Sequence, residues 1–467
     1  MKRRNFFKMI GAGTAVAMLP KFSYGASPTT NIVVVGGGLG GAAAAKYLKL
    51  WGGGNVNVKL ITSANNYMTC IQSNLVATGA LSVSTITRNY DTLQSSYGVT
   101  RRRGLVTAID RVNQTVRVGS SDIHYDYLVL APGVKGIPYS GDPDLTLSFW
   151  EGSKASALKM HLDHIPDGGT FVMYIPSGTI KGALAPYGRA CAVADYLQSR
   201  GCKVIVLDGH TDIPSQKNDF VAAFQSFGST LVAGTNNFTG PVLDYYAGVT
   251  LNSVNIPAKT LDTSMGIIHY HAANVIPPQR AALDWANDYM GNSLGLVPAG
   301  QNFASVDFQT FASTVDPLIY IIGDAQGTTL PKSGNIAADQ AKIVASVITR
   351  KIAGITALET SLAVSAIQFN AIQSTNAHTA VYAHAGYQWN KEAHTFTNPA
   401  NQTVIQSANS WVPSGDLRNN LTGTDSDAGV STNSIPTSLT IPANISGKNY
   451  SQGLTWLDSL LADCYGA

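Results

Sequence analysis

Three glycines near the start of the chain, Gly36, Gly38 and Gly41, have the spacing of a dinucleotide-binding turn. They follow a β-branched run at residues 31–35 and open an Ala-rich stretch that continues to Leu48. In such a turn, glycines permit a tight bend, close approach of the backbone to a pyrophosphate, and close strand–helix packing. The diphosphate then rests on the helix N-terminus, where backbone N–H groups lack partners. This order of strand, turn and helix predicts a dinucleotide site.

Two later segments indicate which dinucleotide this is. Residues 125–133 read as a strand that ends in a turn at Gly133, and residues 317–325 as a second buried strand that ends in Gly323-Asp324. The order resembles that of flavoproteins with two dinucleotide domains, in which the first glycine motif holds the ADP half of FAD. That resemblance implies that Asp324 binds the ribityl-phosphate region of FAD. The alternative is that Asp324 is an ordinary turn residue at the end of a strand.

Further motifs resemble one family within this class, the flavoprotein subunit of flavocytochrome c sulfide dehydrogenase, a relative of the sulfide:quinone reductases. The segments that carry the resemblance are Asn66–Asn74, Pro186–Ala190, Val275–Ala281, Gly323–Ala325 and Pro331–Gly334. The resemblance covers residues 30–355 and continues weakly to a closing segment around Tyr450 and Trp456–Asp458. It implies an FAD-dependent oxidoreductase that passes electrons to a c-type cytochrome. Because no Cys-x-x-Cys-His occurs here, any haem is expected on another chain.

The resemblance also implies how the flavin is held. The cysteine at the position of Cys70 forms a thioether to the flavin 8-methyl carbon in that family; the alternative is a buried apolar cysteine, the commonest state of a free cysteine. Lys332, Ser333 and Gly334 are expected to contact the flavin. A helix that begins near Asn335 would direct its positive N-terminal dipole at the ring and stabilise an anionic reduced flavin. Lys332 is a candidate for added positive charge there, or else a solvated loop lysine.

The sequence departs from the family at three positions that matter for chemistry. Sulfide oxidation in the family uses two redox-active cysteines near the ring, but the first position is Gly182 here, and no cysteine occurs between residues 202 and 464 for the second. The family's acid/base glutamate is replaced by Gly188. Thr62 stands where an acidic residue usually holds the adenosine ribose, so we expect weaker noncovalent FAD binding. A disulfide relay is therefore not expected.

Histidines offer a different route to proton transfer. His378 and His384 lie in the tail region that normally approaches the ring, and His269 and His271 precede the Ile-Pro-Pro motif. A histidine beside the flavin could act as a general base for an organic substrate. We take His378 and His384, with Lys332, as candidate catalytic residues, although most such histidines have structural roles. No metal site is expected, because the histidine spacings lack neighbouring carboxylates.

The elements that position these residues predict an α/β fold with two Rossmann-like dinucleotide-binding domains, as in glutathione reductase, plus a C-terminal α+β interface domain. Strands are expected near residues 32–35, 58–61 and 128–131. The expected FAD-binding domain is discontinuous, at residues 30–145 and 265–355. Residues 356–467 form the expected flavin-covering domain, in which the Ser-, Thr- and Asn-rich stretch 397–450 reads as ordered β-hairpins and loops.

The second Rossmann-like domain is expected at residues 146–264. A strand at residues 168–175, a helix near 189–199 and a strand at 203–208 indicate one α/β unit. The turn after Ile175 lacks the glycine spacing that cradles a pyrophosphate, so NAD is disfavoured as co-substrate.

The N-terminus predicts export. Residues 1–26 contain Arg3-Arg4, a short apolar stretch and small residues for cleavage, which is typical of a twin-arginine signal peptide and of a periplasmic protein. The apolar stretch is too short for a membrane anchor. The formal net charge of +3 depends on five basic groups in this leader, and 26 basic and 28 acidic groups remain without it. With no basic patch, nucleic-acid binding is not expected.

Two functions remain open. The first is a periplasmic FAD oxidoreductase with a donor other than sulfide, or one that acts on sulfur compounds directly at the flavin. The second is a catalytically degenerate electron-transfer or structural subunit of a flavocytochrome c-like complex, which the residues at Gly182 and Gly188 favour.

Overall fold

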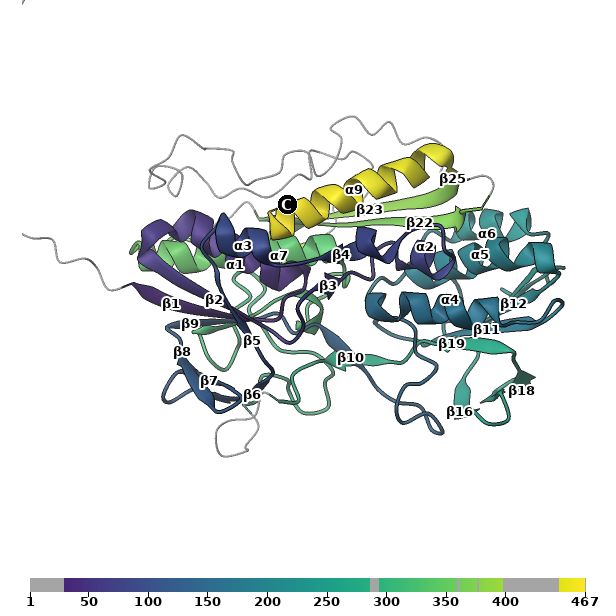
Figure 1. The fold of residues 1–467 in the computed structure, drawn as a ribbon, viewed down its shortest axis with the longest axis horizontal. Helices are drawn as coiled ribbons and strands as arrows, with labels where there is room; N and C mark the ends of the chain where they lie inside the picture. The colour runs from purple at the N-terminus through teal and green to yellow at the C-terminus, as the bar shows by residue number, and fades with distance from the viewer. Residues whose placement is uncertain (1–28, 286–293, 359–361, 376–377, 398–444, 467) are drawn as a thin grey trace, which may run out of the picture.

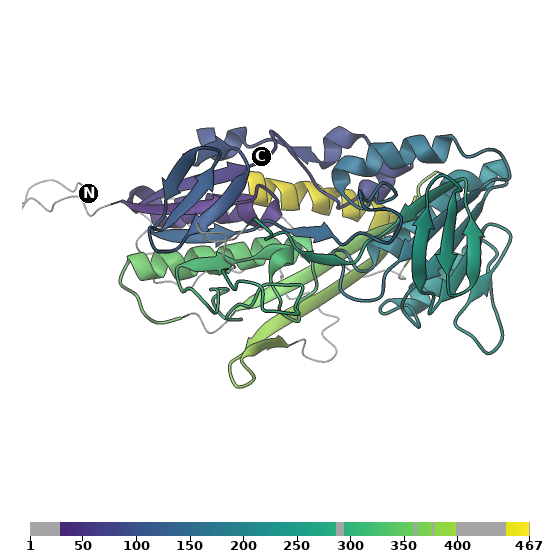
Figure 2. The same ribbon diagram turned by 90° about the horizontal axis from the view of Figure 1, so that it is seen from below.

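The computed structural model describes residues 29–285, 294–358, 362–375, 378–397 and 445–466 of the chain. Two α/β halves lie side by side, and the C-terminal strands and helix extend along both of them (Figure 1; Figure 2). The fold is therefore mixed α/β with two parallel-stranded sheets, as expected. The expected signal peptide at residues 1–26 lies outside the described residues.

The first half is built on a five-stranded parallel sheet in the order β21-β9-β1-β2-β5. Its strands are β1 (Thr30–Val35), β2 (Val56–Thr62), β5 (Thr100–Arg103), β9 (Tyr127–Leu130) and β21 (Ile319–Ile321). The strand from the later part of the chain, β21, pairs with β9, so this sheet combines two segments that lie far apart in the sequence. The central strands are apolar and buried because helices cover both faces of a parallel sheet.

Two long helices pack against each other in this half, α1 (Leu39–Gly52) and α7 (Gly334–Ile352). The alanines of α1 are fully buried, and small side chains permit this close helix approach. The remaining elements of the first half are β3 (Tyr67–Met68), α2 (Ser73–Ala77), β4 (Thr87–Arg88), α3 (Asp91–Ser95), β6 (Val106–Asp110), β7 (Thr115–Val118) and β8 (Ser121–His124). The strands β6, β7 and β8 form an antiparallel meander.

The second half contains a six-stranded sheet in the order β13-β14-β15-β12-β11-β19. Its elements are α4 (Ala155–Asp163), β11 (Thr170–Ile175), α5 (Ala185–Leu197), β12 (Lys203–Asp208), α6 (Lys217–Ser226), β13 (Thr230–Leu231), β14 (Phe238–Thr239), β15 (Leu243–Ala247), β16 (Leu251–Asn255), β17 (Thr260–Thr263), β18 (Gly266–His269) and β19 (Ala272–Val275). Because β19 pairs with β11, this half extends beyond residue 264, where the sequence had placed its end. The difference arises because the β16–β18 hairpins carry no signal that assigns them to either sheet.

A short antiparallel pair lies between the halves. It consists of β10 (Val134–Gly136) and β20 (Gln279–Ala281). The chain passes from the first half to the second through β10 and returns through β20. The C-terminal layer contains β22 (Ala363–Gln373), β23 (Thr379–Asn390), β24 (Thr395–Thr397), β25 (Ile445–Ser446) and α9 (Gly447–Tyr465). The two long strands β22 and β23 form an antiparallel hairpin, which α9 covers along one side of the molecule (Figure 1). Most of the stretch expected to form hairpins, residues 398–444, lies outside the described residues.

The end of α9 is fixed to the first half by a buried carboxylate. Asp463, only 3% exposed, accepts a hydrogen bond from Lys342 Nζ of α7 at 2.7 Å and one from the Tyr47 hydroxyl of α1. The main-chain carbonyl of Asp463 accepts a hydrogen bond from Lys46 Nζ at 2.8 Å. A buried charge persists only where it is paired and hydrogen-bonded. Asp463 therefore joins the three helices α1, α7 and α9. No helix in the described part of the chain is long and apolar enough to span a membrane.

We expect Asp463→Ala to destabilise the protein by about 3–5 kcal/mol, because the Lys342 ammonium would stay buried without its carboxylate. Urea unfolding would measure this loss. Asp458→Ala is the matched control on the same helix: Asp458 pairs with Arg88 at 3.2 Å on the surface, and such a pair contributes about 1 kcal/mol or less. Equal losses in the two variants would contradict the role given to Asp463.

Candidate functional site

A cavity of about 440 Å³ opens at the carboxyl ends of the strands of the first half. Its walls come from the β1–α1 turn, the loop after β2, the N-terminus of α7, the loop before α5 in the second half, and β22. Ligands of open α/β sheets bind at this edge of the sheet. Nearly all the residues singled out from the sequence as cofactor contacts line it: Gly36, Gly38, Thr62, Cys70, Gly133, Gly323, Asp324, Lys332, Ser333 and Gly334.

The β1–α1 turn accepts only glycine at two of the three motif positions. At Gly36, φ is +106°, and a Cβ would lie 2.1 Å from the carbonyl oxygen of Ala131 on the neighbouring strand. At Gly41, a Cβ would lie 1.8 Å from the carbonyl oxygen of Gly36. Gly38 is the N-cap residue of α1. Because glycine has no side chain, no capping group accepts hydrogen bonds from the first N–H groups of the helix, and these groups face the cavity. This geometry fits a diphosphate.

Thr62, at the end of β2, is buried and joined to a residue that the sequence did not single out. Its hydroxyl oxygen accepts a hydrogen bond from Arg101 Nε of β5 at 3.0 Å. The Arg101 guanidinium also donates to the carbonyl of Ala64 at 2.7 Å and lies 4.6 Å from the centre of the Tyr90 ring. The adenosine end of the cavity thus has a neutral hydroxyl supported by an arginine in place of a carboxylate.

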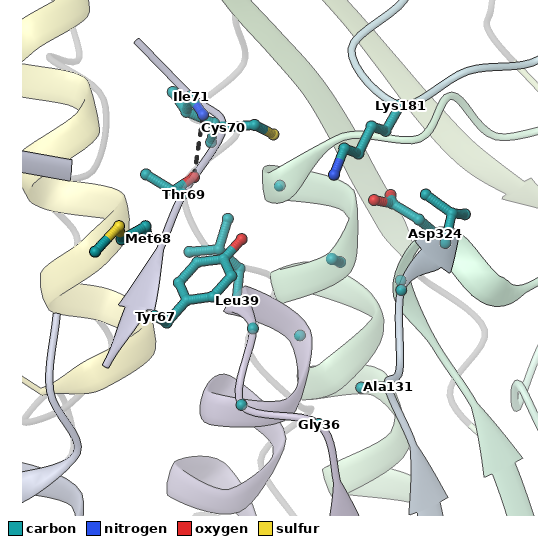
Figure 3. Close-up of a pocket in the computed structure, with 18 of the residues that line it drawn as sticks. Gly36, Leu39, Tyr67, Met68, Thr69, Cys70, Ile71, Ala131, Lys181 and Asp324 are labelled. Carbon is teal, nitrogen blue, oxygen red and sulfur yellow. Dashed lines mark hydrogen bonds between the residues drawn. The ribbon is translucent and has the colours of Figure 1, made fainter. Parts of the chain in front are cut away.

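Three polar groups meet at the other end of the cavity. The Cys70 sulfur, the Lys181 ammonium and the Asp324 carboxylate face the same open space (Figure 3). Lys181 comes from the second half of the molecule and forms an ion pair with Glu151 Oε2 at 2.6 Å. Burial raises the pKa of the Cys70 thiol, and the nearby Lys181 charge opposes that rise. Burial by itself would lower the pKa of Lys181. The negative charges of Glu151 and Cys70 outweigh this effect, so the pKa of Lys181 is raised and the side chain stays charged.

Asp324 lies in a short turn after β21, where Gly323 adopts a φ of +70° and donates its N–H to Gln340 Oε1 at 2.7 Å. Burial raises the pKa of Asp324 against the opposing charges of Lys181 and Lys332. At the start of α7, Ser333 is the N-cap, and its hydroxyl accepts a hydrogen bond from the N–H of Ile336. The N-terminus of α7 therefore faces the cavity beside Asp324, as the sequence predicted.

The loop that carries Cys70 is held by Arg189, a fully buried residue of α5. The Arg189 guanidinium donates to Asn74 Oδ1 at 2.8 Å and to the carbonyl of Phe149 at 2.8 Å. It also stacks on Trp150, with 4.6 Å between the guanidinium carbon and the ring centre. The Pro-Tyr-Gly-Arg motif therefore has a structural role, because it joins the second half to the Cys70 loop.

Lys332 lines the cavity, and its ammonium is hydrogen-bonded within the protein. Its ammonium donates to the carbonyl of Gln326 at 2.9 Å and lies 3.7 Å from the centre of the Phe303 ring, and neither partner lines the cavity. Burial lowers the pKa of Lys332 to about 8. Lys332 is thus a buried lysine of the cavity wall and not a solvated loop lysine, and its charge interacts with Asp324. Lys181 provides a second cation, which points into the cavity (Figure 3).

The side chains of three of the four histidine candidates are described, and none of these three lines the cavity. His378 is exposed, and its ring makes an edge-on contact with Tyr450 at 5.1 Å. His384 lies in β23 opposite Ile367, and its side chain is outside what the structure describes. His378 does not line the cavity, and His269 and His271 are exposed in the second half. The structure therefore does not place His378 where a general base for a donor at the cavity would be needed, because its side chain lies on the surface against Tyr450.

Of the two positions of the missing sulfide chemistry, Gly182 and Gly188, only Gly182 lines the cavity. Gly182 lines the cavity with a φ of +65°. At Gly188, a Cβ would lie 2.7 Å from the Cβ of Asn370 in β22, so Asn370 fills the space that a glutamate would need. All four cysteines are free, and Cys191, Cys202 and Cys464 are buried. Among the described residues, no group of three or more His, Cys, Asp or Glu side chains could hold a metal ion.

The second half has an acidic residue where dinucleotide domains often hold a ribose, at the end of β12. This residue, Asp208, is fully buried, and its carboxylate accepts hydrogen bonds from the hydroxyls of Tyr187 at 2.7 Å and Tyr245 at 2.9 Å. His210 bonds to the other carboxylate oxygen at 2.9 Å. The turn after β12 also packs on the loop after β11, because a Cβ at Gly209 would lie 2.6 Å from a backbone nitrogen of that loop. Asp208 is committed to internal contacts.

Sequence reasoning missed several groups at the site: Arg101, Glu151, Lys181 and Asn370. Arg101 belongs to a run of three arginines on an edge strand, and Lys181 directly precedes Gly182. The one signal in the sequence that could have pointed to Lys181 is its position directly before Gly182, where the family has a redox-active cysteine.

Comparison with known proteins identifies the class. The sequence model of the family "Sulfide dehydrogenase (flavocytochrome c) flavoprotein chain, central" matches residues 155–277, and that of "Pyridine nucleotide-disulphide oxidoreductase" matches residues 30–165. Among curated proteins, ferroptosis suppressor protein 1 of Taeniopygia guttata is 31% identical over 114 residues. That match spans 24% of this chain and 29% of that protein.

Solved structures share the fold at low sequence identity. The sulfide:quinone oxidoreductase of Aquifex aeolicus superposes with a TM-score of 0.62 at 17% identity, over 76% of this chain and 84% of that one. The NAD-dependent persulfide reductase of A. fulgidus gives a TM-score of 0.55 at 16% identity, over 77% and 71%. A ferredoxin reductase of Rhodopseudomonas palustris gives 0.56 at 14% identity, over 76% and 82%.

Replacing Lys181 should make the Cys70 thiol less reactive. In flavin-free protein, we expect Lys181→Met to slow alkylation of Cys70 by iodoacetamide several-fold at neutral pH, because removing the cation leaves burial and Glu151 to raise the thiol pKa further. Peptide mass spectrometry would follow the rate, and the other three cysteines are buried. Lys332→Met is the matched control, since the Lys332 ammonium faces Gln326. An equal effect of the two substitutions would show that Lys181 is not the relevant cation.

Proposed function

Because this chain is a flavin-dependent oxidoreductase of the sulfide dehydrogenase flavoprotein type, we propose that it is a periplasmic enzyme that passes electrons from a small donor through FAD to a c-type cytochrome. The observation that carries the proposal is one cavity that joins a glycine-lined diphosphate site to Cys70 and Asp324, with glycine at both positions of the family's sulfide chemistry. A bound flavin accepts two electrons from a donor and can release them one at a time, as transfer to a haem requires.

The residues present fit FAD along the whole cavity. The turn at Gly36–Gly41 would hold the diphosphate, Thr62 with Arg101 the adenosine ribose, and Asp324 the ribityl chain. The N-terminus of α7 would face the flavin, where its dipole favours negative charge on the ring. Lys181 adds a charged ammonium at the same end, held in place by Glu151.

We propose a thioether between Cys70 and the flavin 8-methyl carbon. The new S–C bond would replace the thiol S–H bond and one methyl C–H bond, and the two electrons released would pass to the flavin and from it to the electron acceptor. Two observations support it: the sulfur faces the cavity, and Arg189 holds the loop that carries it. Lys181 favours the thiolate, which is the nucleophilic form of the side chain. With Thr62 in place of a carboxylate at the ribose, a covalent tether would compensate for weaker noncovalent binding.

The donor is expected to react at the flavin itself. A disulfide relay has no sulfur at Gly182. The space beside Gly188, at the acid/base position, is filled by Asn370, whose amide does not ionise near neutral pH. Besides Cys70, the titratable groups at this end of the cavity include Glu151, Lys181, Asp324 and Lys332. Proton transfer that accompanies oxidation of the donor would use the Glu151–Lys181 pair.

A nicotinamide dinucleotide is not the proposed donor. The loop after β11 lacks a glycine cradle, and Asp208 is already bonded to two tyrosines and His210. A ribose would have to displace three internal hydrogen bonds to reach that carboxylate.

Export and the cytochrome partner rest on sequence and family. The twin-arginine motif at residues 3–4 supports export of a folded, flavin-loaded protein, and the matched family is described as a flavocytochrome c chain. The second candidate, a degenerate electron-transfer subunit, is favoured by Asn370, which closes the acid/base position.

The donor can be sought by anaerobic bleaching of the flavin absorbance. We expect sulfide, NADH and NADPH to bleach the flavin far more slowly than photoreduced protein reduces cytochrome c. We expect another small donor to bleach the flavin at the turnover rate. Bleaching by sulfide at the turnover rate would overturn the loss of relay chemistry. If every donor failed while photoreduced protein still reduced cytochrome c, the degenerate subunit would be the better description.

The tether is tested by denaturing the protein. Wild-type protein should retain flavin after acid precipitation and show the added mass of FAD on the peptide that contains Cys70, whereas Cys70→Ser should release all of its flavin. Cys191→Ser is the control, because Cys191 is buried away from the cavity, and it should retain flavin as wild type does. Release of all flavin from the wild type would refute the thioether and leave noncovalent FAD unaffected.

A further inference from the structure

The glycine-rich turn is contacted by two tyrosines that lie far apart in the sequence, Tyr90 and Tyr465. The main-chain carbonyl oxygen of Gly37 accepts a hydrogen bond from the Tyr465 hydroxyl at 2.7 Å and from the Tyr90 hydroxyl at 3.1 Å. A carbonyl oxygen has two lone pairs, so these two tyrosines use its whole capacity as an acceptor. Tyr465 is the third residue from the C-terminus, and its ring is 1% exposed.

The position of this carbonyl determines where the next N–H group points. A trans peptide unit is planar, with C=O and N–H on opposite sides, so fixing the Gly37 oxygen fixes the Gly38 N–H in the opposite direction. Gly38 is the N-cap of α1 and lines the cavity, at the place where a diphosphate needs backbone donors. A Cβ at Gly37 would lie 2.3 Å from the Tyr90 hydroxyl oxygen, so Gly37 is also restricted to glycine by this contact.

Tyr465 is itself held firmly from two sides. Its ring packs against Tyr67 with centroids 6.0 Å apart and against Tyr90 with centroids 5.9 Å apart. Two residues earlier, Asp463 joins the end of α9 to α1 and α7 through its buried hydrogen bonds. The last turn of α9 therefore places the Tyr465 hydroxyl with little freedom.

We propose that Tyr465 and Tyr90 are positioning residues for FAD, and that the last turn of α9 completes the diphosphate site by orienting the Gly37–Gly38 peptide. Docking of the chain's end and binding of FAD are then linked: each stabilises the other by the same factor. The first glycine motif alone does not form the finished site, because its carbonyl is oriented by a side chain 428 residues away. This inference depends on FAD in the cavity and on neither the donor nor the electron acceptor.

The test uses Cys70→Ser protein, in which bound FAD is free to dissociate, and measures the FAD dissociation constant by flavin fluorescence. Tyr465→Phe and Tyr90→Phe each leave one donor on the Gly37 oxygen, so we expect each to weaken FAD binding about three- to ten-fold. The double substitution leaves the part-buried Gly37 carbonyl without either tyrosine donor, and we expect weakening on the order of thirty-fold or more. Tyr320→Phe is the matched control: this buried tyrosine of the same domain bonds to Lys351 instead, and its loss should leave FAD affinity unchanged.

A second measurement separates positioning from general stability. In flavin-free protein, the single tyrosine variants should unfold at the same urea concentration as the parent within a few tenths molar. Added FAD should slow hydrogen exchange at the end of α9 in the parent, and should do so much less in Tyr90→Phe/Tyr465→Phe. Unchanged FAD affinity in the double variant would overturn the proposal. The proposal would also be overturned if the variants lost FAD affinity only in proportion to a loss of stability of the flavin-free protein. If Cys70→Ser protein with both tyrosines intact bound no FAD at all, the flavin site itself would be contradicted. That outcome differs from one in which the parent binds FAD and the tyrosine variants bind it equally well.

Discussion

The close approach of backbone to backbone at the β1–α1 turn is the constraint from which the rest of the site follows. Gly36 lies against the carbonyl of Ala131, and Gly41 lies against the carbonyl of Gly36, at distances that no side chain allows. That contact brings the start of α1 to the end of the parallel sheet and directs its unpaired N–H groups at the cavity. The diphosphate site, and therefore the orientation of any dinucleotide along the cavity, depends on this packing.

The opposite end of the cavity is a product of two domains. Cys70 and Asp324 belong to the first half, whereas Glu151 lies just before α4 and Lys181 lies in the loop before α5, both in the second half. Arg189 joins the halves through buried hydrogen bonds, so the ammonium of Lys181 is held near Cys70 by the packing of one domain on the other. The reactive end is thus more sensitive to how the halves pack than the diphosphate end is.

The departures from the sulfide dehydrogenase pattern are coupled in space. Asn370 occupies the volume beside Gly188, so a glutamate could not be restored there while Asn370 remains. Lys181 adjoins Gly182, and with Glu151 it supplies charged, titratable groups where the family has sulfur. The cavity is consistent with a flavin that exchanges electrons directly with its donor, and the glycine turn that would hold the diphosphate is intact.

The sequence by itself determined the parts of the protein that depend on backbone geometry. The glycine turn, the strands β1, β2, β9 and β21, and the Gly323–Asp324 turn were all predictable, because positive φ, close approach and apolar runs leave a local signature. The tertiary structure decided which side chains face the cavity. It directed Lys332 at Gln326 and Lys181 at Cys70, left His378 on the surface, and committed Asp208 to internal tyrosines. Side-chain direction depends on packing between segments distant in the chain, and no local pattern encodes such contacts.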